Sequence, residues 1–161
     1  MIYLATALIV GTLDITYAIL FSYFRSGTPP QRLLQSVAAG WFGRDAAFAG
    51  GASTAAAGLG FHFLIAFTIT AIFFVAAFRL PALVRRPAIA GPLYGIGVYI
   101  VMNWVVIPLS RIGPRPFPAA VVFVSGVLVH MFLIGLPIAL GARRALAARG
   151  GRTFAGAAVR G

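Results

Sequence analysis

Four polar residues stand inside long apolar stretches of this sequence, and their side chains are the ones that could do chemistry. They are Asp14, His62, Asn103 and His130, one in each stretch. An unpaired carboxylate near the centre of a bilayer costs about 2.5–3.5 kcal/mol on insertion scales, so Asp14 must be protonated or paired. We expect His62 to be its partner, because both residues are predicted at roughly 9–14 Å below the same membrane boundary.

Several kinds of site are compatible with these residues. An Asp–His pair in a low-dielectric bundle could carry protons or gate an ion. Asp14, His62 and His130 could ligate zinc if His130, predicted roughly 20 Å deep, were raised by a helical turn. The two histidines could hold haem, although a four-helix interior is narrow. Alternatively, the side chains only form interhelical hydrogen bonds of about 1 kcal/mol each. We therefore regard the four residues as a candidate proton or ion site, with interhelical hydrogen bonding as the open alternative, and expect no metal or cofactor.

The predicted helix faces direct these polar groups into a bundle. Residues at helical spacing from Asp14 and His62 are mostly small, which lets membrane helices approach closely. These neighbours are Ala7, Gly11, Ala18 and Ser22 on the first face, and Gly51, Ala55, Gly58 and Ala66 on the second. Pro108 and Pro137 lie near the ends of the third and fourth stretches, where each removes a backbone donor and is predicted to bend its helix.

The elements that must position these residues are membrane spans. Of 161 residues, 61% are hydrophobic and 9% charged, whereas a soluble domain carries about a quarter charged residues. Four stretches reach the ~20 residues that a bilayer requires: 2–24, 54–78, 91–109 and 117–140. We predict an all-α polytopic membrane protein with one domain over 1–148. The first stretch lacks a basic leader and a cleavage site, so we expect a retained helix.

Arginine placement predicts the orientation. Eight of the thirteen arginines fall in the loop between the second and third spans and in the tail, against five on the other side. The positive-inside rule then places both termini in the cytoplasm of a bacterial inner membrane. The basic segment 149–161 lacks apolar periodicity and is predicted to be a flexible tail that contacts anionic lipid.

A short amphipathic helix is predicted over 29–42, between the first two spans. Thr28 is its expected N-cap, with proline at the first helical position and Gln31 three residues after the cap. Arg32, Gln35 and Ser36 form the opposite, polar face, and Gly43 ends the helix. We expect it at the membrane interface, either capping the bundle or serving as a substrate gate or docking helix. Its apolar face comprises Leu33, Leu34, Val37, Trp41 and Phe42.

Composition and motifs argue against other functions. The net charge of +11 comes from arginines that flank apolar runs, which indicates topology and not nucleic-acid binding. The sequence has no cysteine, no phosphate-binding glycine loop and no GxSxG motif. Its two acids, Asp14 and Asp45, are predicted at different depths, which disfavours paired-carboxylate catalysis. We therefore predict that the protein is not an enzyme.

Three segments resemble the YagU-like family of bacterial inner-membrane proteins. They are TAAAGLGFHFLIAFTITAIFFVA, GPLYGIGVYIVMNWVVIPLSRIGPRP and GVLVHMFLIGLPIALGARR, which together cover roughly 54–144. The resemblance implies an inner-membrane location and a role in the cell envelope, with no established biochemical activity. Asn103 stands where the family pattern has a histidine. The matching positions are His62, Asn103, Pro108, Leu109 and His130.

These observations lead to two functional hypotheses. The first is a transport or envelope-stress component that handles protons or ions through the Asp/His/Asn layer. The second is a non-catalytic structural or assembly subunit of a larger membrane complex. Because four short helices leave little room for a path within one subunit, we expect a homo-oligomer or a membrane partner.

Overall fold

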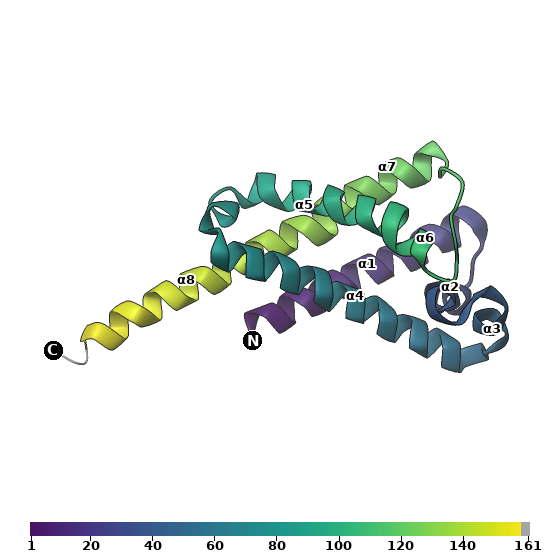
Figure 1. Cartoon of the computed structure of the whole chain (residues 1–161), viewed down its shortest axis with the longest axis horizontal. Coiled ribbons are helices and arrows are strands. Elements are labelled where there is room, and N and C mark those ends of the chain that lie inside the picture. Colours follow the sequence, from purple (N-terminus) through teal and green to yellow (C-terminus); the bar gives the residue numbers. More distant parts are fainter. Residues whose placement is uncertain (159–161) are drawn as a thin grey trace.

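The computed structural model describes residues 1–158, with side chains through Arg149, and this part of the chain folds into helices joined by short loops (Figure 1). In chain order the helical elements are α1 (Ile2–Ser26), α2 (Pro30–Phe42), α3 (Arg44–Ala49), α4 (Gly51–Arg79), the 3-10 turn η1 (Pro81–Val84), α5 (Pro87–Val101), the π-turn η2 (Met102–Val106), α6 (Ile107–Leu109), α7 (Ala120–Val129), the π-turn η3 (His130–Gly135) and α8 (Leu136–Ala158).

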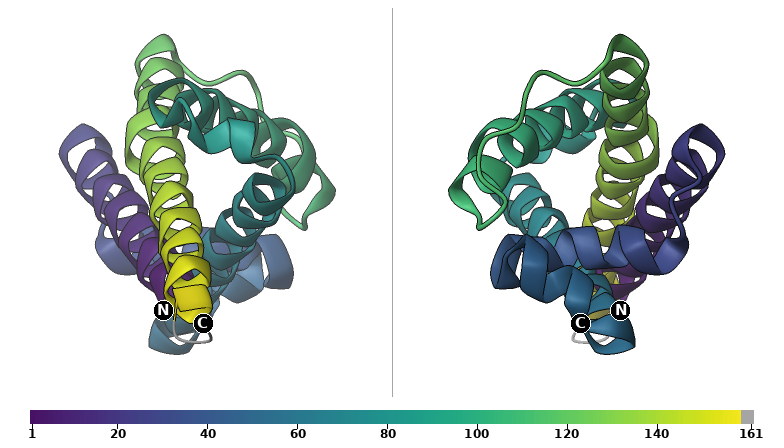
Figure 2. Two further views of the ribbon diagram at one scale, coloured as in Figure 1. Left: turned by 90° about the vertical axis from the view of Figure 1, so that its left-hand side faces the viewer. Right: turned by 90° about the vertical axis from the view of Figure 1, so that its right-hand side faces the viewer.

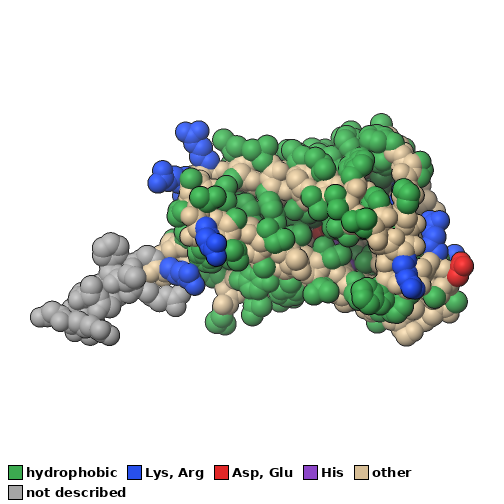
Figure 3. Space-filling model, in the orientation of Figure 1, with side chains coloured by type: hydrophobic (Ala, Val, Ile, Leu, Met, Phe, Trp, Pro, Cys, Tyr) green, Lys and Arg blue, Asp and Glu red, His purple; other side chains and the backbone are tan. Residues whose placement is uncertain are grey.

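Four helical segments are long and apolar enough to cross a membrane: Ile2–Ser26, Gly51–Arg79, Pro87–Leu109 and Ala120–Arg149. They confirm the predicted all-α, multi-pass architecture. Apolar side chains cover the middle of the molecule, whereas arginines gather at both ends (Figure 3). This distribution matches a hydrocarbon layer flanked by two aqueous interfaces.

Two span boundaries differ from the prediction because of prolines. The third span begins at Pro87 and not at 91, since proline is well suited to the first helical position, where its missing N–H is not needed. The fourth begins at Ala120 and not at 117. Pro116 and Pro118 favour extended backbone at the residues before them, which delays the start of α7.

The spans pack most tightly in the half of the bundle away from α2. There α1, α4, α8 and η1 share a buried apolar core that includes Val10, Phe73 and Ile138. The third and fourth spans are antiparallel neighbours, as predicted, and touch through glycines. A Cβ added at Gly95 would overlap the carbonyl oxygen of His130, and one at Gly135 would overlap that of Gly91. Only glycine allows this backbone contact.

Helix α2 lies crosswise over one end of the bundle (Figure 2). We call this the α2 end; it also contains α3 and residues 110–119. The bounds of α2 nearly equal the predicted 29–42, and Gly43, at φ 84°, ends the helix as expected. Trp41 and Phe42 are exposed, while Leu33, Leu34 and Val37 are partly buried.

Two details of the α2 prediction are wrong. Gln35, assigned to the polar outer face, is 3% exposed and donates from Nε2 to the carbonyl oxygen of Gly51 at 3.0 Å. The reason is that α2 packs on α4, where Gly58 admits the backbone of Leu34. Thr28 does not cap the helix: Pro29 occupies the cap in an extended conformation, and the Thr28 hydroxyl bonds that of Ser26.

Two segments that were not predicted as helices are helical in the structure: α3 and the end of α8. The short helix α3 was not predicted, because its six residues are too few to show an apolar period. The predicted flexible tail, 149–161, overlaps α8, whose backbone is helical to Ala158. The side chains beyond Arg149 lie outside the described residues, so the proposed contact of this segment with lipid stays a prediction.

Both intramembrane prolines follow a π-helical turn. Ile107, just before Pro108, donates its N–H to the carbonyl of Met102, and Leu136, just before Pro137, donates to that of Met131. A proline ring clashes with the carbonyl four residues earlier, and the wider turn displaces that carbonyl. The predicted helix disturbances thus take the form of η2 and η3.

Candidate functional site: a polar cavity among the spans

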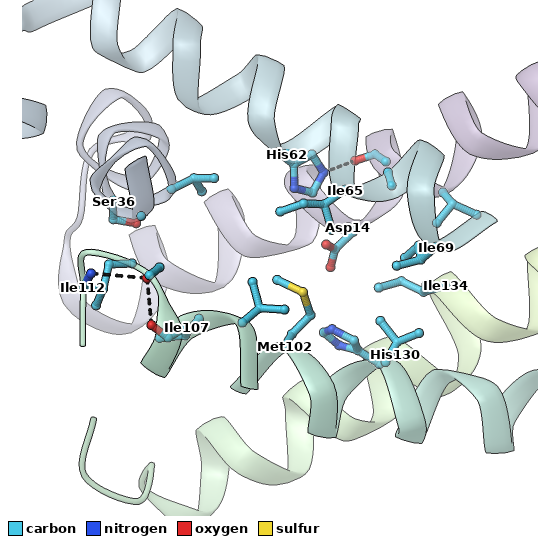
Figure 4. Close-up of a pocket in the computed structure, with 18 of the residues that line it drawn as sticks. Asp14, Ser36, His62, Ile65, Ile69, Met102, Ile107, Ile112, His130 and Ile134 are labelled. Atoms are coloured by element: carbon cyan, nitrogen blue, oxygen red, sulfur yellow. Dashed lines mark hydrogen bonds between the residues drawn. The ribbon is translucent and has the colours of Figure 1, made fainter. Parts of the chain in front are cut away.

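Three of the four predicted polar residues line one cavity of about 250 Å³. Asp14 comes from α1, His62 from α4 and His130 from the start of η3. The Asp14 carboxylate lies between the two imidazole rings (Figure 4). All three side chains are partly buried, so the small-residue faces direct them into the bundle as the sequence predicts.

His62 does not pair with Asp14, contrary to expectation. Its Nε2 lies 2.9 Å from the carbonyl oxygen of Gly11, one turn before Asp14 on α1. A carbonyl oxygen only accepts, so Nε2 carries the hydrogen and Nδ1 of the neutral ring is left as an acceptor. Gly11 is buried, and its missing side chain leaves room for Phe63 and Ala66 of α4. This close approach of α1 and α4 brings the ring of His62 to the α1 backbone.

His130 is the histidine that interacts electrostatically with Asp14. Its Nδ1 donates to the carbonyl oxygen of Gly126 at 2.8 Å, which leaves Nε2 as the free nitrogen. α7 starts at Ala120, so His130 lies ten residues from the start of its helix and not thirteen as the predicted span start at 117 implied. His130 and Asp14 line the same cavity.

Asp14 has no hydrogen bond or ion pair to any side chain within the described part of the chain. In Figure 3 an acidic group is visible at the bottom of a hollow in the apolar belt. The carboxylate therefore faces a cavity and not a fixed partner. Such a group can take up and release a proton without breaking a protein hydrogen bond.

Asn103 lies in a neighbouring cavity of about 510 Å³, and not with the other three. Its Nδ2 donates to the carbonyl of Tyr99 at 2.9 Å. Tyr99 lies one turn earlier in the same span, so this bond joins no second helix. Tyr17 lines the same cavity, and its buried hydroxyl has no partner among the described residues. His130 lines both cavities and so separates them.

The first cavity is closed at one side and accessible at the other. Buried Val10 and Ile134 form its floor above the apolar core, while exposed Arg115 and Val106 lie at the α2 end. Ser36 and Ser110 add hydroxyl groups between that end and Asp14. Sequence reasoning missed Ser110 and Arg115 as lining residues, because nothing in their local pattern shows that loop 110–119 folds back against α2. The backbone N–H of Arg111 bonds Gly40 there.

The potential metal ligands of this cavity do not form an assembled metal site. Within the described residues, no three His, Cys, Asp or Glu side chains are grouped so that they could hold a metal ion. The rings of His62 and His130 also point their bonded nitrogens at different backbone carbonyls. The metal hypothesis from the sequence therefore gains no support.

Fold and site together define a multi-pass α-helical protein with a largely apolar cavity inside its transmembrane bundle, into which Asp14, His62 and His130 project. No protein-family model, curated protein or solved structure matches the chain.

Proposed function

We propose that this protein is a proton- or ion-handling component of a bacterial inner membrane, acting in transport or in the response to envelope stress. One observation carries the proposal: an unbonded carboxylate, Asp14, faces two histidines in a cavity within the apolar belt. Placing an ionisable group within the hydrocarbon layer costs free energy. Its presence there therefore favours a functional role.

The proposed chemistry is reversible protonation. His130 keeps its Nδ1 hydrogen on Gly126, so Nε2 is the atom that takes up a proton, and the Asp14 carboxylate stabilises the imidazolium that forms. The Nε2 hydrogen of His62 stays on the Gly11 carbonyl, so Nδ1 is the atom of that ring at which another proton would bind. Protons or small cations would enter from the α2 end past Ser110 and Ser36. Release on the other side requires movement at the floor formed by Val10 of α1 and Ile134 of η3.

Orientation and location belong to the same proposal. Six arginines of the described residues lie at the end opposite α2, against five at the α2 end, and this excess supports cytoplasmic termini. The six are Arg79, Arg85, Arg86, Arg143, Arg144 and Arg149. The α2 end would then face the periplasm. The resemblance to the YagU-like family supports an envelope role, and the site contains no nucleophile–base pair that would favour an enzyme.

We further propose that the working unit is a homo-oligomer or includes a membrane partner. The cavity within one subunit ends at a buried floor, so one chain offers no continuous path in this conformation. The competing hypothesis is a structural subunit, in which the polar side chains only join helices.

The deciding experiment is proton flux into liposomes that contain purified protein and a trapped pH-sensitive dye. Under an imposed pH gradient, wild-type protein should collapse the gradient faster than empty liposomes. Asp14→Asn should slow this flux by about tenfold or more, since the amide cannot carry the proton. Asp45→Asn is the matched control, because Asp45 is the other acid and lies exposed in α3 at the α2 end.

Equal flux for wild type and Asp14→Asn would overturn the proposal, provided both variants elute as single species. If Asp14→Asn instead removed a co-purifying membrane protein and left flux unchanged, the structural-subunit hypothesis would replace it.

A further inference from the structure

A second pocket, at the α2 end, carries four of the arginines. It measures about 680 Å³ and is formed by the end of α1, by α2 and α3, and by the loop leading into α7. Arg25, Arg32, Arg44 and Arg115 all line it, and all four are exposed. No carboxylate is among its lining residues.

With the orientation proposed above, this clustering runs against the rule that places arginines on the cytoplasmic side. Five arginines belong to the α2 end, and only Arg111 lies outside the pocket. Topology alone would disfavour arginine here, and mutual repulsion would disfavour gathering the residues at one site. Desolvation by the surrounding pocket atoms, together with repulsion from Arg44, lowers the pKa of Arg115 below its usual range. A local anion would relieve this repulsion.

Two of the four arginines are also held in place by neighbouring rings. The guanidinium of Arg32 lies 4.4 Å from the centre of the Phe48 ring, and that of Arg25 lies 5.8 Å from the Phe21 ring. Stacking of this kind limits the freedom of a long side chain while leaving its N–H groups available. The pocket therefore presents partly ordered donors.

The rest of the lining fits an amphiphile better than a free ion. Hydroxyl groups of Ser22, Ser26 and Thr28 stand beside the arginines, and apolar Leu33, Phe117 and Val122 form the walls. The pocket borders the end of α1 and the start of α7, two of the candidate membrane spans, which is where lipid headgroups would meet the hydrocarbon layer. Arginine forks match phosphate oxygens, and hydroxyl groups match a glycerol moiety.

From this geometry we infer that the arginine pocket binds the phosphate headgroup of an anionic phospholipid from the leaflet at the α2 end. The inference does not depend on proton handling, since it rests on other residues and a different readout.

The test is native mass spectrometry of detergent-purified protein titrated with phosphatidylglycerol, with phosphatidylcholine as the neutral reference lipid. Wild-type protein should retain phosphatidylglycerol selectively. Arg44→Gln with Arg115→Gln should weaken this retention by about tenfold, whereas Arg44→Lys with Arg115→Lys, which keeps the charge, should lose less. The matched control is Arg85→Gln with Arg86→Gln, an equal charge change on exposed arginines at the opposite end.

Equal losses in the two glutamine pairs would overturn the inference, because they would reveal general attraction to positive charge. Titration with inorganic phosphate, followed by thermal unfolding, separates the two sources of phosphate. If inorganic phosphate raised the unfolding temperature but phosphatidylglycerol were not selectively retained, the inference that the ligand is a lipid would be overturned. Selective retention that disappears only in the Arg44/Arg115 glutamine pair would support it.

Discussion

His62 on α4 donates a hydrogen bond from Nε2 to the carbonyl oxygen of Gly11 on α1, across 2.9 Å and one helical turn before Asp14. His130 makes the corresponding bond with its other nitrogen, Nδ1, to Gly126 on its own helix. The two histidines that share the Asp14 cavity are therefore held as opposite tautomers. This difference decides which nitrogen of each ring remains free to accept a proton.

The first prediction concerns those tautomers. At neutral pH, the nitrogen-15 NMR spectrum of protein labelled on histidine should show hydrogen on Nε2 of His62 and on Nδ1 of His130, because each bonded carbonyl can only accept. Single His62→Gln and His130→Gln variants assign the two signals. Finding the hydrogen on Nε2 of His130 would contradict the geometry described for the site.

The second prediction concerns the contact between the third and fourth spans. Gly95→Ala should lower the free energy of unfolding by about 2 kcal/mol or more, because the added methyl overlaps the His130 carbonyl and the two backbones must separate. Gly97→Ala is the control on the same helix, where a Cβ meets nothing within 4 Å. It should be neutral or stabilising by up to about 1 kcal/mol.

Denaturation of both glycine variants in detergent, followed by circular dichroism, measures this difference. Because His130 begins η3 at this contact, Gly95→Ala should also disturb the Asp14 cavity, whereas Gly97→Ala should not. Similar stability of the two variants would argue against the close backbone packing of α5 on η3.

The third prediction compares two tyrosines in the bundle. The hydroxyl of Tyr94 donates to the carbonyl of Ile69 at 2.6 Å, so Tyr94→Phe should cost about 1 kcal/mol of stability. The buried hydroxyl of Tyr17 has no partner among the described residues, so Tyr17→Phe should cost less than about 0.5 kcal/mol or should stabilise. Thermal unfolding of the two variants under the same conditions ranks them; a larger loss for Tyr17→Phe would refute the assignment.

Much of the architecture follows from local sequence. The run 66–77 is apolar except for Thr68 and Thr70, and only lipid or a large protein core can satisfy that pattern at this chain length. Pro30 and Gly43 bound α2 through their own backbone preferences. Small residues beside Asp14 and His62 show that both face other helices. Each of these inferences uses residues no more than a few turns apart.

The sequence could not decide which residues of different helices contact each other. It favoured an Asp14–His62 pair, but the approach of α1 to α4 at Gly11 directs His62 to a backbone carbonyl, and His130 is the histidine that interacts with Asp14. The Asn103 side chain donates to the carbonyl of Tyr99 in its own span, and Gln35 is buried because α2 packs on α4.

By itself, then, the sequence determined that this chain spans a membrane four times and that its few polar residues face inward, since solvation and helical periodicity act on each segment separately. Only the tertiary structure decided the cavity, the histidine tautomers and the arginine pocket. These depend on helix rotation, depth and loop folding, and a shift of a single turn, about 5.4 Å, changes every contact.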